Sequence, residues 1–351
     1  MLDFTYDTLP SRVVFGVGAL DRLADEVDRL GAAKVLVLCT PSGRARGENI
    51  AGRLGGRVVG IYDKAVMHVP AETAAAAQEE ARRLGADCCV AAGGGSTIGL
   101  GKAIALDGGL PVIAVPMTYA GSEMTPIWGL TEGGVKRTGR DPRVLPKTVI
   151  YDPALTVSLP ASVSGPSGIN AIAHCVEALY AGDGNPITSL MAEEGIRSLS
   201  KGLQIVIETP DDLDARSLAL YGAWLAGATL GVVSVGLHHK LCHTLGGSFN
   251  LPHAEVHAVI LPHAVAYNSV AAPEAMARVA RALGAEDAAG GLYDLAVAVG
   301  AKVALKDIGM AAGDLDRAAD LATQNPYDNP RPVTRDGVRA LLQDAFDGVR
   351  P

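Results

Sequence analysis

Residues 88–106 read CCVAAGGGSTIGLGKAIAL, and this stretch indicates the fold class. An apolar run typical of a buried strand leads into a segment of helical character through a short polar turn made of Gly93, Gly94, Gly95, Ser96 and Thr97. Glycines at such a turn let backbone amides approach a pyrophosphate, and the start of a helix adds partial positive charge. The stretch predicts an α/β unit with a phosphate-binding turn. A tight strand–helix turn without a ligand is the alternative.

The sequence around this stretch repeats the same alternation. Ala-rich amphipathic segments separate further apolar runs, which lie at 34–39, 57–62 and 111–116. The pattern favours parallel strands joined by helices, because parallel neighbours need long crossover connections. We therefore expect a Rossmann-like α/β dinucleotide-binding domain over residues 1–157.

The pattern changes after residue 157. Long segments of helical character follow, at 186–205, 213–232, 238–247 and 273–301. The Pro-rich stretch 325–334 is typical of a loop before one last helix. We expect an all-α substrate and catalytic domain over residues 158–351.

Hydroxyl side chains follow two of the predicted strands. Thr118, Tyr119 and Ser122 come after the run at 111–116, and Thr40 and Ser42 come after the run at 34–39. Ligands of open α/β sheets bind beyond the carboxyl ends of the strands. These residues are therefore candidates for contacts with a dinucleotide.

The residues after the run at 34–39 also bear on the choice of cofactor. An acidic residue that would hold the adenosine ribose of NAD is missing there, and Arg44 is placed to meet a 2′-phosphate. We expect use of NADH, with NADPH tolerated. A second glycine cluster, FGVGAL at 15–20, resembles the Rossmann fingerprint, but Asp21 stands where its third glycine belongs. We interpret that cluster as a turn that closes an N-terminal hairpin.

Composition excludes several classes of protein. The formal net charge is −8, which argues against a nucleic-acid partner. The five cysteines lack the spacing of a disulfide framework or a zinc ribbon, so we expect reduced, mostly buried thiols. The N-terminus does not resemble a signal peptide, and the uncharged stretch 217–237 contains four glycines. We expect a cytoplasmic protein in which this stretch is a buried helix pair, without a membrane span.

Histidines give the strongest functional signal. Seven of the eight lie between residues 174 and 263: His174, His238, His239, His243, His253, His257 and His263. On a helix the spacing of His239 and His243 puts both imidazoles on one face, and His253 follows a Gly-Gly turn that can fold back toward them. Asn170 and His174 are the only polar residues expected to face inward from an apolar helix. Four histidines from two regions favour an active site, whereas His238 and His263 are interpreted as structural.

The motifs follow one another in a specific order: GGGS at 93–96, PMTYAGSEMT at 116–125, NAIAHCVEAL at 170–179 and HKLCHTLGGSFNLPH at 239–253. In this order they resemble the iron-containing alcohol dehydrogenases, and the resemblance covers nearly the whole chain. It implies the dehydroquinate synthase-like fold of that superfamily, with the active site in a cleft between an α/β domain and a helical domain. It also implies that His174, His239 and His253 match metal ligands and that His243 lies beside the substrate.

One position departs from the family pattern. The aspartate that completes the metal site is replaced by Asn170, and a neutral amide is a much poorer ligand for a hard divalent ion. Zinc held by three neutral imidazoles, as in some catalytic zinc sites, is the alternative. The motifs above, together with residues 131–153, are similar to the maleylacetate reductase subgroup, which shares this departure. The subgroup implies reduction of the carbon–carbon double bond of maleylacetate to 3-oxoadipate, in the breakdown of resorcinol-type and chlorinated aromatics. It also implies a homodimer, and we expect no metal.

This reaction assigns roles to the cluster. Hydride addition to a conjugated alkene leaves an enolate, which must be stabilised and protonated. His243 is the first candidate for the proton donor or enolate partner, followed by His253 and His239. Lys240 is a candidate receiver for a substrate carboxylate, and a solvated lysine is the alternative.

Two other functions stay open on the sequence. A metal-dependent alcohol or polyol dehydrogenase would use His174, His239 and His253 as ligands and reduce a carbonyl. A nucleotide-binding structural or regulatory protein would have lost catalysis, which the histidine cluster argues against.

Overall fold

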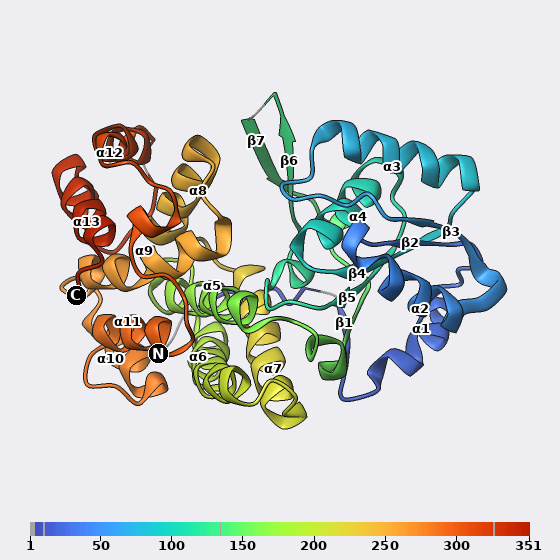
Figure 1. The fold of residues 1–351 in the computed structure, drawn as a ribbon, viewed down its shortest axis with the longest axis horizontal. Coiled ribbons are helices and arrows are strands. Elements are labelled where there is room, and N and C mark those ends of the chain that lie inside the picture. The colour runs from blue at the N-terminus through green and yellow to red at the C-terminus, as the bar shows by residue number, and fades with distance from the viewer. Residues whose placement is uncertain (1–3, 10, 134, 326) are drawn as a thin grey trace. The chain divides into compact units, whose positions relative to one another are not determined.

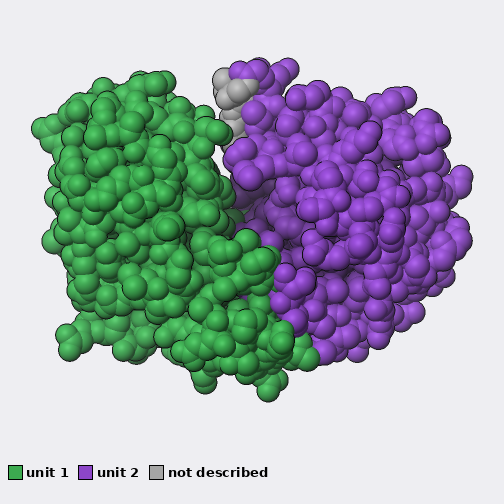
Figure 2. Space-filling view, in the orientation of Figure 1, with its two compact units in different colours: residues 1–7, 159–351 green, residues 8–158 purple. Residues whose placement is uncertain are grey.

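The computed structural model describes residues 4–9, 11–133, 135–325 and 327–351, and the chain forms two compact units. One unit comprises residues 8–158, and the other comprises residues 1–7 and 159–351 (Figure 2). The stretch 325–334 contains Pro326, which lies outside the described residues.

The unit of residues 8–158 is built on a parallel six-stranded sheet in the order β1-β8-β5-β4-β2-β3 (Figure 1). The strands of this sheet are β1 (Arg12–Phe15), β2 (Val35–Leu38), β3 (Val58–Tyr62), β4 (Cys88–Gly93), β5 (Val112–Pro116) and β8 (Thr148–Tyr151). A separate antiparallel pair consists of β6 (Ile127–Glu132) and β7 (Val135–Arg140). The unit's α-helices are α1 (Leu23–Arg29), α2 (Arg44–Leu54), α3 (Ala71–Leu84) and α4 (Gly95–Gly108).

The inner strands β2, β4 and β5 are buried on both faces, which explains their continuous apolar runs. Along β4, Cys88 and Val90 pack with α1 and α2 in one core cluster. Ala91 points to the other face, where Gly101 of α4 comes so close that a Cβ on this glycine would lie 3.3 Å from the Ala91 Cβ. The two-residue alternation therefore places α4, and the glycine turn before it, directly over the centre of the sheet.

The second unit is helical. Its α-helices are α5 (Ala161–Tyr180), α6 (Pro186–Glu208), α7 (Leu213–Leu230), α8 (Leu237–Phe249), α9 (His253–Asn268), α10 (Pro273–Leu283), α11 (Ala288–Ala298), α12 (Leu315–Thr323) and α13 (Arg335–Asp347). Apolar faces of α8, α9, α12 and α13 form one core cluster. An N-terminal parallel α/β unit followed by helices confirms the predicted fold class.

Four local predictions were wrong. FGVGAL closes no hairpin, because β1 pairs in parallel with β8 and Arg12 lies opposite Thr148. The segment 273–301 is two helices, α10 and α11, because Gly284 ends the first with a left-handed backbone and Asp287 caps the second. The Gly-Gly pair before His253 lies inside α8, and the turn is made by Asn250 with φ of 53°. The stretch 217–237 holds most of α7 and the connection to α8 rather than a helix pair.

Two further predictions concern the sequence as a whole. All five cysteines are free and buried, which confirms the prediction of reduced thiols. Among the described residues, none of the helices has the length and apolar character that crossing a membrane requires.

A carboxylate joins the turn after β1 to the end of β8. Asp152 is nearly buried and accepts hydrogen bonds from the backbone N–H of Gly18 at 3.1 Å, Leu20 at 3.1 Å and Ala154 at 3.1 Å. Removing this acceptor would leave those amide groups without their partner.

We predict that Asp152→Ala lowers the free energy of unfolding by about 1–3 kcal/mol, because buried N–H groups lose their acceptor. Asp28→Ala is the matched control, since Asp28 forms only an exposed ion pair with Arg57 at 3.0 Å. Urea denaturation measures both variants. Equal stability of the two variants would contradict the role assigned to Asp152.

Candidate functional site

The glycine turn between β4 and α4 has room only for backbone. Gly93 has φ of +153°, and a Cβ there would lie 2.6 Å from Oγ1 of Thr97. A Cβ on Gly94 would lie 3.0 Å from Cγ2 of Thr118, on the loop after β5. The N-cap residue Gly94 has no side chain to cap α4, and the N–H of Thr97 donates to the Gly94 carbonyl at 3.1 Å, which leaves the N–H groups of Gly95 and Ser96 for an anion. The turn therefore fits the pyrophosphate of a dinucleotide.

Lys102 holds the loop that faces this turn. Its side chain projects from α4, is 1% exposed, and donates to the carbonyl oxygens of Ser122 at 2.6 Å, Thr125 at 2.8 Å and Ile127 at 2.8 Å. Its ammonium also lies 3.3 Å from Oγ of Ser122 and 3.0 Å from Oγ1 of Thr125. The Ser122 hydroxyl, predicted to contact the cofactor, is thus also a partner of Lys102. The sequence analysis missed Lys102, although a lone lysine in an apolar helix is a detectable signal.

Burial affects both charged side chains of this loop anchor. It lowers the pKa of Lys102 to about 7, while the neighbouring Glu123 carboxyl acts in the opposite direction. Burial raises the pKa of Glu123, whose Oε1 accepts a hydrogen bond from the hydroxyl of Tyr151 at 2.8 Å. Tyr119, another predicted cofactor residue, is completely buried in the same loop. The hydrogen bonds of Lys102 and Glu123 therefore hold the loop after β5 in place.

Thr40 and Arg44, which follow β2, form hydrogen bonds with nearby residues. Oγ1 of Thr40 accepts a hydrogen bond from the N–H of Gly43 at 3.1 Å and lies 3.3 Å from Oγ of Ser42. Arg44 donates to Asp63 at 2.8 Å and to Glu48 at 2.9 Å. The hydrogen bond from Arg44 lowers the pKa of Asp63. Asp63 follows the neighbouring strand β3, so an acidic residue stands close to the place where the sequence after β2 lacks one.

Histidines from α5, α8 and α9 lie together in the helical unit. Nδ1 of His174 lies 2.8 Å from Nε2 of His239, and their rings stack with centroids 4.9 Å apart. The His239 ring centroid is 6.0 Å from that of His243 and 5.1 Å from that of His257. The His257 centroid is 4.6 Å from that of His253. All four histidines predicted for the site therefore join one connected group.

Glu177 is the acidic member of this group. It is 1% exposed on α5, and its Oε2 lies 2.6 Å from Nδ1 of His239. Burial alone would raise the pKa of Glu177, but its interactions with His239, which include the hydrogen bond between them, and the hydrogen bond from the Gly236 amide outweigh burial and lower the pKa to about 2. The prediction that Asn170 and His174 are the only polar inward residues of this helix was therefore wrong. Glu177 lies three residues beyond His174, on the same helical face.

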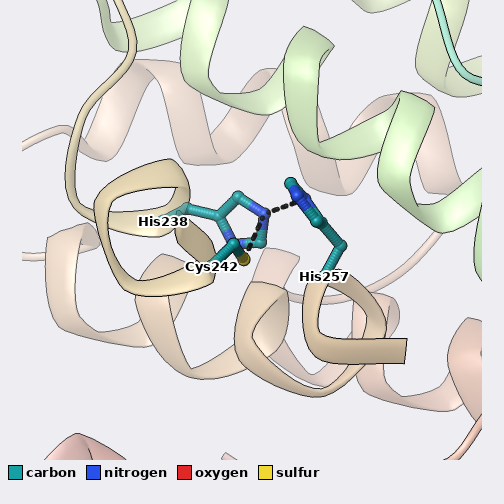
Figure 3. Close-up of side chains that lie close together, drawn as sticks. All are labelled: His238, Cys242 and His257. Atoms are coloured by element: carbon teal, nitrogen blue, oxygen red, sulfur yellow. Dashed lines mark hydrogen bonds between the residues drawn. The ribbon is translucent and has the colours of Figure 1, made fainter. Parts of the chain in front are cut away.

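A second group, which shares His257 with the first, consists of the completely buried residues His238, Cys242 and His257 (Figure 3). Nε2 of His238 is 2.8 Å from Nδ1 of His257 and 3.6 Å from Sγ of Cys242. Burial lowers the pKa of His238 to about 3 and that of His257 well below its usual value, so both rings are neutral. Within the described part of the chain, these three residues are the one set whose ligand atoms all lie within 4.8 Å of one another.

The outer nitrogens of this buried group argue against a metal centre. Metal-bound imidazoles normally donate their second N–H to a carboxylate or carbonyl. Nδ1 of His238 and Nε2 of His257 have no hydrogen-bond partner among the described residues. We therefore assign His238, Cys242 and His257 to a hydrogen-bonded core. This agrees with the structural interpretation of His238.

The remaining candidates lie nearer the surface. His243 is exposed on α8, and His253 is half-buried at the start of α9. Lys240 is half-buried, and its Nζ lies 5.7 Å from the ring centroid of Tyr327. The histidine group thus extends from the buried carboxylate of Glu177 to the exposed imidazole of His243 and the half-buried imidazole of His253.

The four positions that match metal ligands by resemblance supply three imidazoles and one amide. Oδ1 of Asn170 is buried and has no hydrogen-bond partner among the described residues, but it carries no charge. Nε2 of His239 and Nδ1 of His174 face each other, and the nearby Glu177 carboxylate is occupied by His239. A hard divalent ion prefers carboxylate oxygen. This donor set does not fit such an ion, and we derive no chemical step from a metal.

Comparisons with known proteins cover the whole chain. Residues 10–153 match the iron-containing alcohol dehydrogenase family, and residues 165–346 match the C-terminal part of the same family. The chain is 60% identical over 348 residues to maleylacetate reductase of Burkholderia cepacia, with 99% of each chain covered. It is 56% identical over 350 residues to maleylacetate reductase of Sphingobium indicum, covering 100% of this chain and 99% of the other. The crystal structure of maleylacetate reductase from Agrobacterium tumefaciens has a TM-score of 0.97 at 52% identity, with 100% of both chains covered.

We predict that Gly94→Val weakens NADH binding and raises its KM, because the side chain would enter the space between the turn and Thr118. Gly52→Val is the matched control, since a Cβ on this exposed helical glycine meets nothing within 4 Å. Fluorescence titration with NADH and thermal melting compare the two. Normal NADH affinity in a folded Gly94→Val protein would rule out this turn as the cofactor site.

Proposed function

The chain belongs to the iron-containing alcohol dehydrogenase family, and from that premise we propose that it reduces maleylacetate with NADH or NADPH. It is an NAD(P)H-dependent oxidoreductase, and its full-length relatives include maleylacetate reductases. The observation that carries the proposal is the histidine group around Glu177, in which the metal-site aspartate of the family is replaced by Asn170. This arrangement suits proton chemistry better than Lewis-acid chemistry.

The cofactor binds through the unit of residues 8–158. Gly93, Gly94 and Gly95 leave space for the pyrophosphate, and the first turn of α4, which contains Ser96 and Thr97, supplies the N–H groups of Gly95 and Ser96. Thr118, Tyr119 and Ser122 form the facing loop, and Thr40 and Ser42 belong to the turn after β2. When bound, the reduced nicotinamide supplies the hydride.

The dinucleotide preference follows from Arg44 and Asp63. A 2′-phosphate needs a cation, but Arg44 is already paired with Asp63 and Glu48. The Asp63 carboxylate would also repel the phosphate, whereas it is a suitable acceptor for a ribose hydroxyl. We therefore expect NADH to be preferred and NADPH to be tolerated, as a ratio of kcat/KM values.

The substrate determines which protein groups are required. The double bond of maleylacetate is conjugated with a ketone. Hydride adds to the alkene carbon remote from the ketone, and the electron pair of the double bond moves to the ketone oxygen as an enolate. Protonation of the carbon next to the ketone then gives 3-oxoadipate. The protein must therefore stabilise an oxyanion and supply one proton.

The imidazoles meet both requirements. His243 is exposed and close to His239, so it is the first candidate for the proton donor or enolate partner. His253 and His239 are the next candidates, and His174 is hydrogen-bonded to His239. Lys240, one turn before His243 on α8, is the candidate receiver of a substrate carboxylate.

Three further features belong to the proposal by resemblance. The enzyme acts without a metal, forms a homodimer and works in the cytoplasm, in the breakdown of aromatic compounds. A metal-dependent alcohol or polyol dehydrogenase is the second candidate, because His174, His239 and His253 are retained at the family's ligand positions. The direct test compares NADH oxidation with fresh maleylacetate and with a panel of aldehydes and ketones.

We predict that His243→Ala lowers kcat by about 10²–10⁴-fold, the usual range for a general acid–base group. Its NADH affinity and melting temperature should match those of the wild type, since the side chain is exposed and the glycine turn lies in the other unit. Ser248→Ala, at an exposed position of the same helix, should keep full activity. A near-normal kcat for His243→Ala would shift the proton chemistry to His253 or His239.

We predict that treatment with a chelator leaves most of the maleylacetate-dependent activity, because the charged ligand of the family's metal site is replaced by Asn170. Elemental analysis of the treated protein confirms that metal has been removed. Activity that vanishes with chelator and returns with iron or zinc would favour the metal-dependent dehydrogenase.

A further inference from the structure

Glu177 is the one buried carboxylate in direct contact with the described histidine group. Its Oε2 accepts from His239 Nδ1 at 2.6 Å and from the Gly236 N–H at 3.0 Å. Its Oε1 accepts from the His238 N–H at 2.9 Å and from the Tyr180 hydroxyl at 3.2 Å. A carboxylate offers about four acceptor positions, and these four donors use them.

These contacts set the tautomer of His239. An ionised carboxylate can only accept, so Nδ1 of His239 carries the hydrogen of that bond. In the neutral ring, Nε2 is then an acceptor. Because Nε2 of His239 lies 2.8 Å from Nδ1 of His174, the hydrogen between them belongs to His174. The hydrogen of neutral His174 is thereby fixed on Nδ1, and its Nε2 carries a lone pair.

The same carboxylate sets the position of the helix that carries His239 and His243. Gly236 is the N-cap of α8 and provides no side chain to its N–H groups. Glu177 supplies the missing acceptor from α5, and its negative charge faces the positive end of the helix dipole. The place and the rotation of α8 therefore depend on this contact.

We propose that Glu177 is a positioning residue of the reaction, which fixes the tautomer and ring orientation of His239 and, through it, the hydrogen-bond direction of His174. The proposal rests on the proposed function, in which this histidine group carries the proton chemistry. Glu177 itself touches neither substrate nor cofactor. Its effect reaches the reacting atoms only through the imidazoles and through the placement of α8.

Glu177→Gln tests this role with a side chain of the same size. Glutamine has one acceptor oxygen, so in either orientation its amide nitrogen faces two donors, and the charge-assisted bond to His239 is lost. We expect kcat to fall about 10- to 1,000-fold, the range seen when a group that orients a histidine or fixes its tautomer is removed. The affinity for NADH should stay unchanged.

Tyr180→Phe is the matched control. It removes one donor from Oε1 and leaves the carboxylate bonded to His239. We expect its kcat to remain near that of the wild type. If Tyr180→Phe is as slow as Glu177→Gln, the effect comes from packing around the carboxylate, and the proposal is wrong.

Nuclear magnetic resonance of histidine-labelled protein reports the tautomer directly. The wild type and Tyr180→Phe should show a low-field Nδ1–H proton, assigned to His239 by its absence in His239→Asn, and Glu177→Gln should lose it. A wild-type His239 that carries its hydrogen on Nε2 overturns the proposal, even if Glu177→Gln does not fold. A Glu177→Gln enzyme with near-normal kcat also overturns it. Failure of the wild type to reduce maleylacetate refutes the proposed function instead, because the tautomer measurement does not depend on activity.

Discussion

The hydrogen-bonded carboxylate of Glu177 is the contact on which the geometry of the helical unit depends most. Burying an isolated carboxylate costs several kcal/mol or more, so the charge is stable in the core only because four donors surround it. Two of those donors are the amides that begin α8, and one is the ring of His239. The position of α8 relative to α5 and the orientation of His239 therefore depend on the same carboxylate.

The unit of residues 8–158 contains a similar arrangement, in which the buried ionisable side chain is a lysine instead of a glutamate. Lys102 projects from α4 and gathers three backbone carbonyls of the loop after β5. In each unit, one buried ionisable side chain on a helix holds a neighbouring segment through its backbone groups: Glu177 bonds the first amides of α8, and Lys102 bonds carbonyls after β5. A carboxylate suits the amides at a helix start, and an ammonium suits the carbonyls of an irregular loop.

The sequence predicts those features that local pattern determines. The run from Cys88 to Thr97 shows its strand, turn and helix, because each has a short-range signal. The parallel pairing of β1 with β8 was not predicted, because the two strands are far apart in the sequence and the glycines after β1 favour a hairpin. The burial of Glu177 was not predicted for a related reason. A carboxylate is normally solvated, and the donors from α8 that offset the free-energy cost of its burial are distant in the sequence. The histidines were recognised by their number, but the hydrogen bonds between them depend on how three helices pack.

The replacement of an aspartate by Asn170 has a consistent chemical meaning in this environment. Reduction of a simple carbonyl places negative charge on an oxygen that has no conjugated group to share it, and a metal ion is one way to stabilise that charge. Hydride addition to a conjugated alkene spreads the charge over an enolate, for which hydrogen-bond donors are sufficient. A second carboxylate beside Glu177 would compete with it for the imidazole hydrogens and disfavour an enolate nearby. The neutral amide of Asn170 removes this conflict, so Glu177 sets the hydrogen positions of His239 and, through it, of His174.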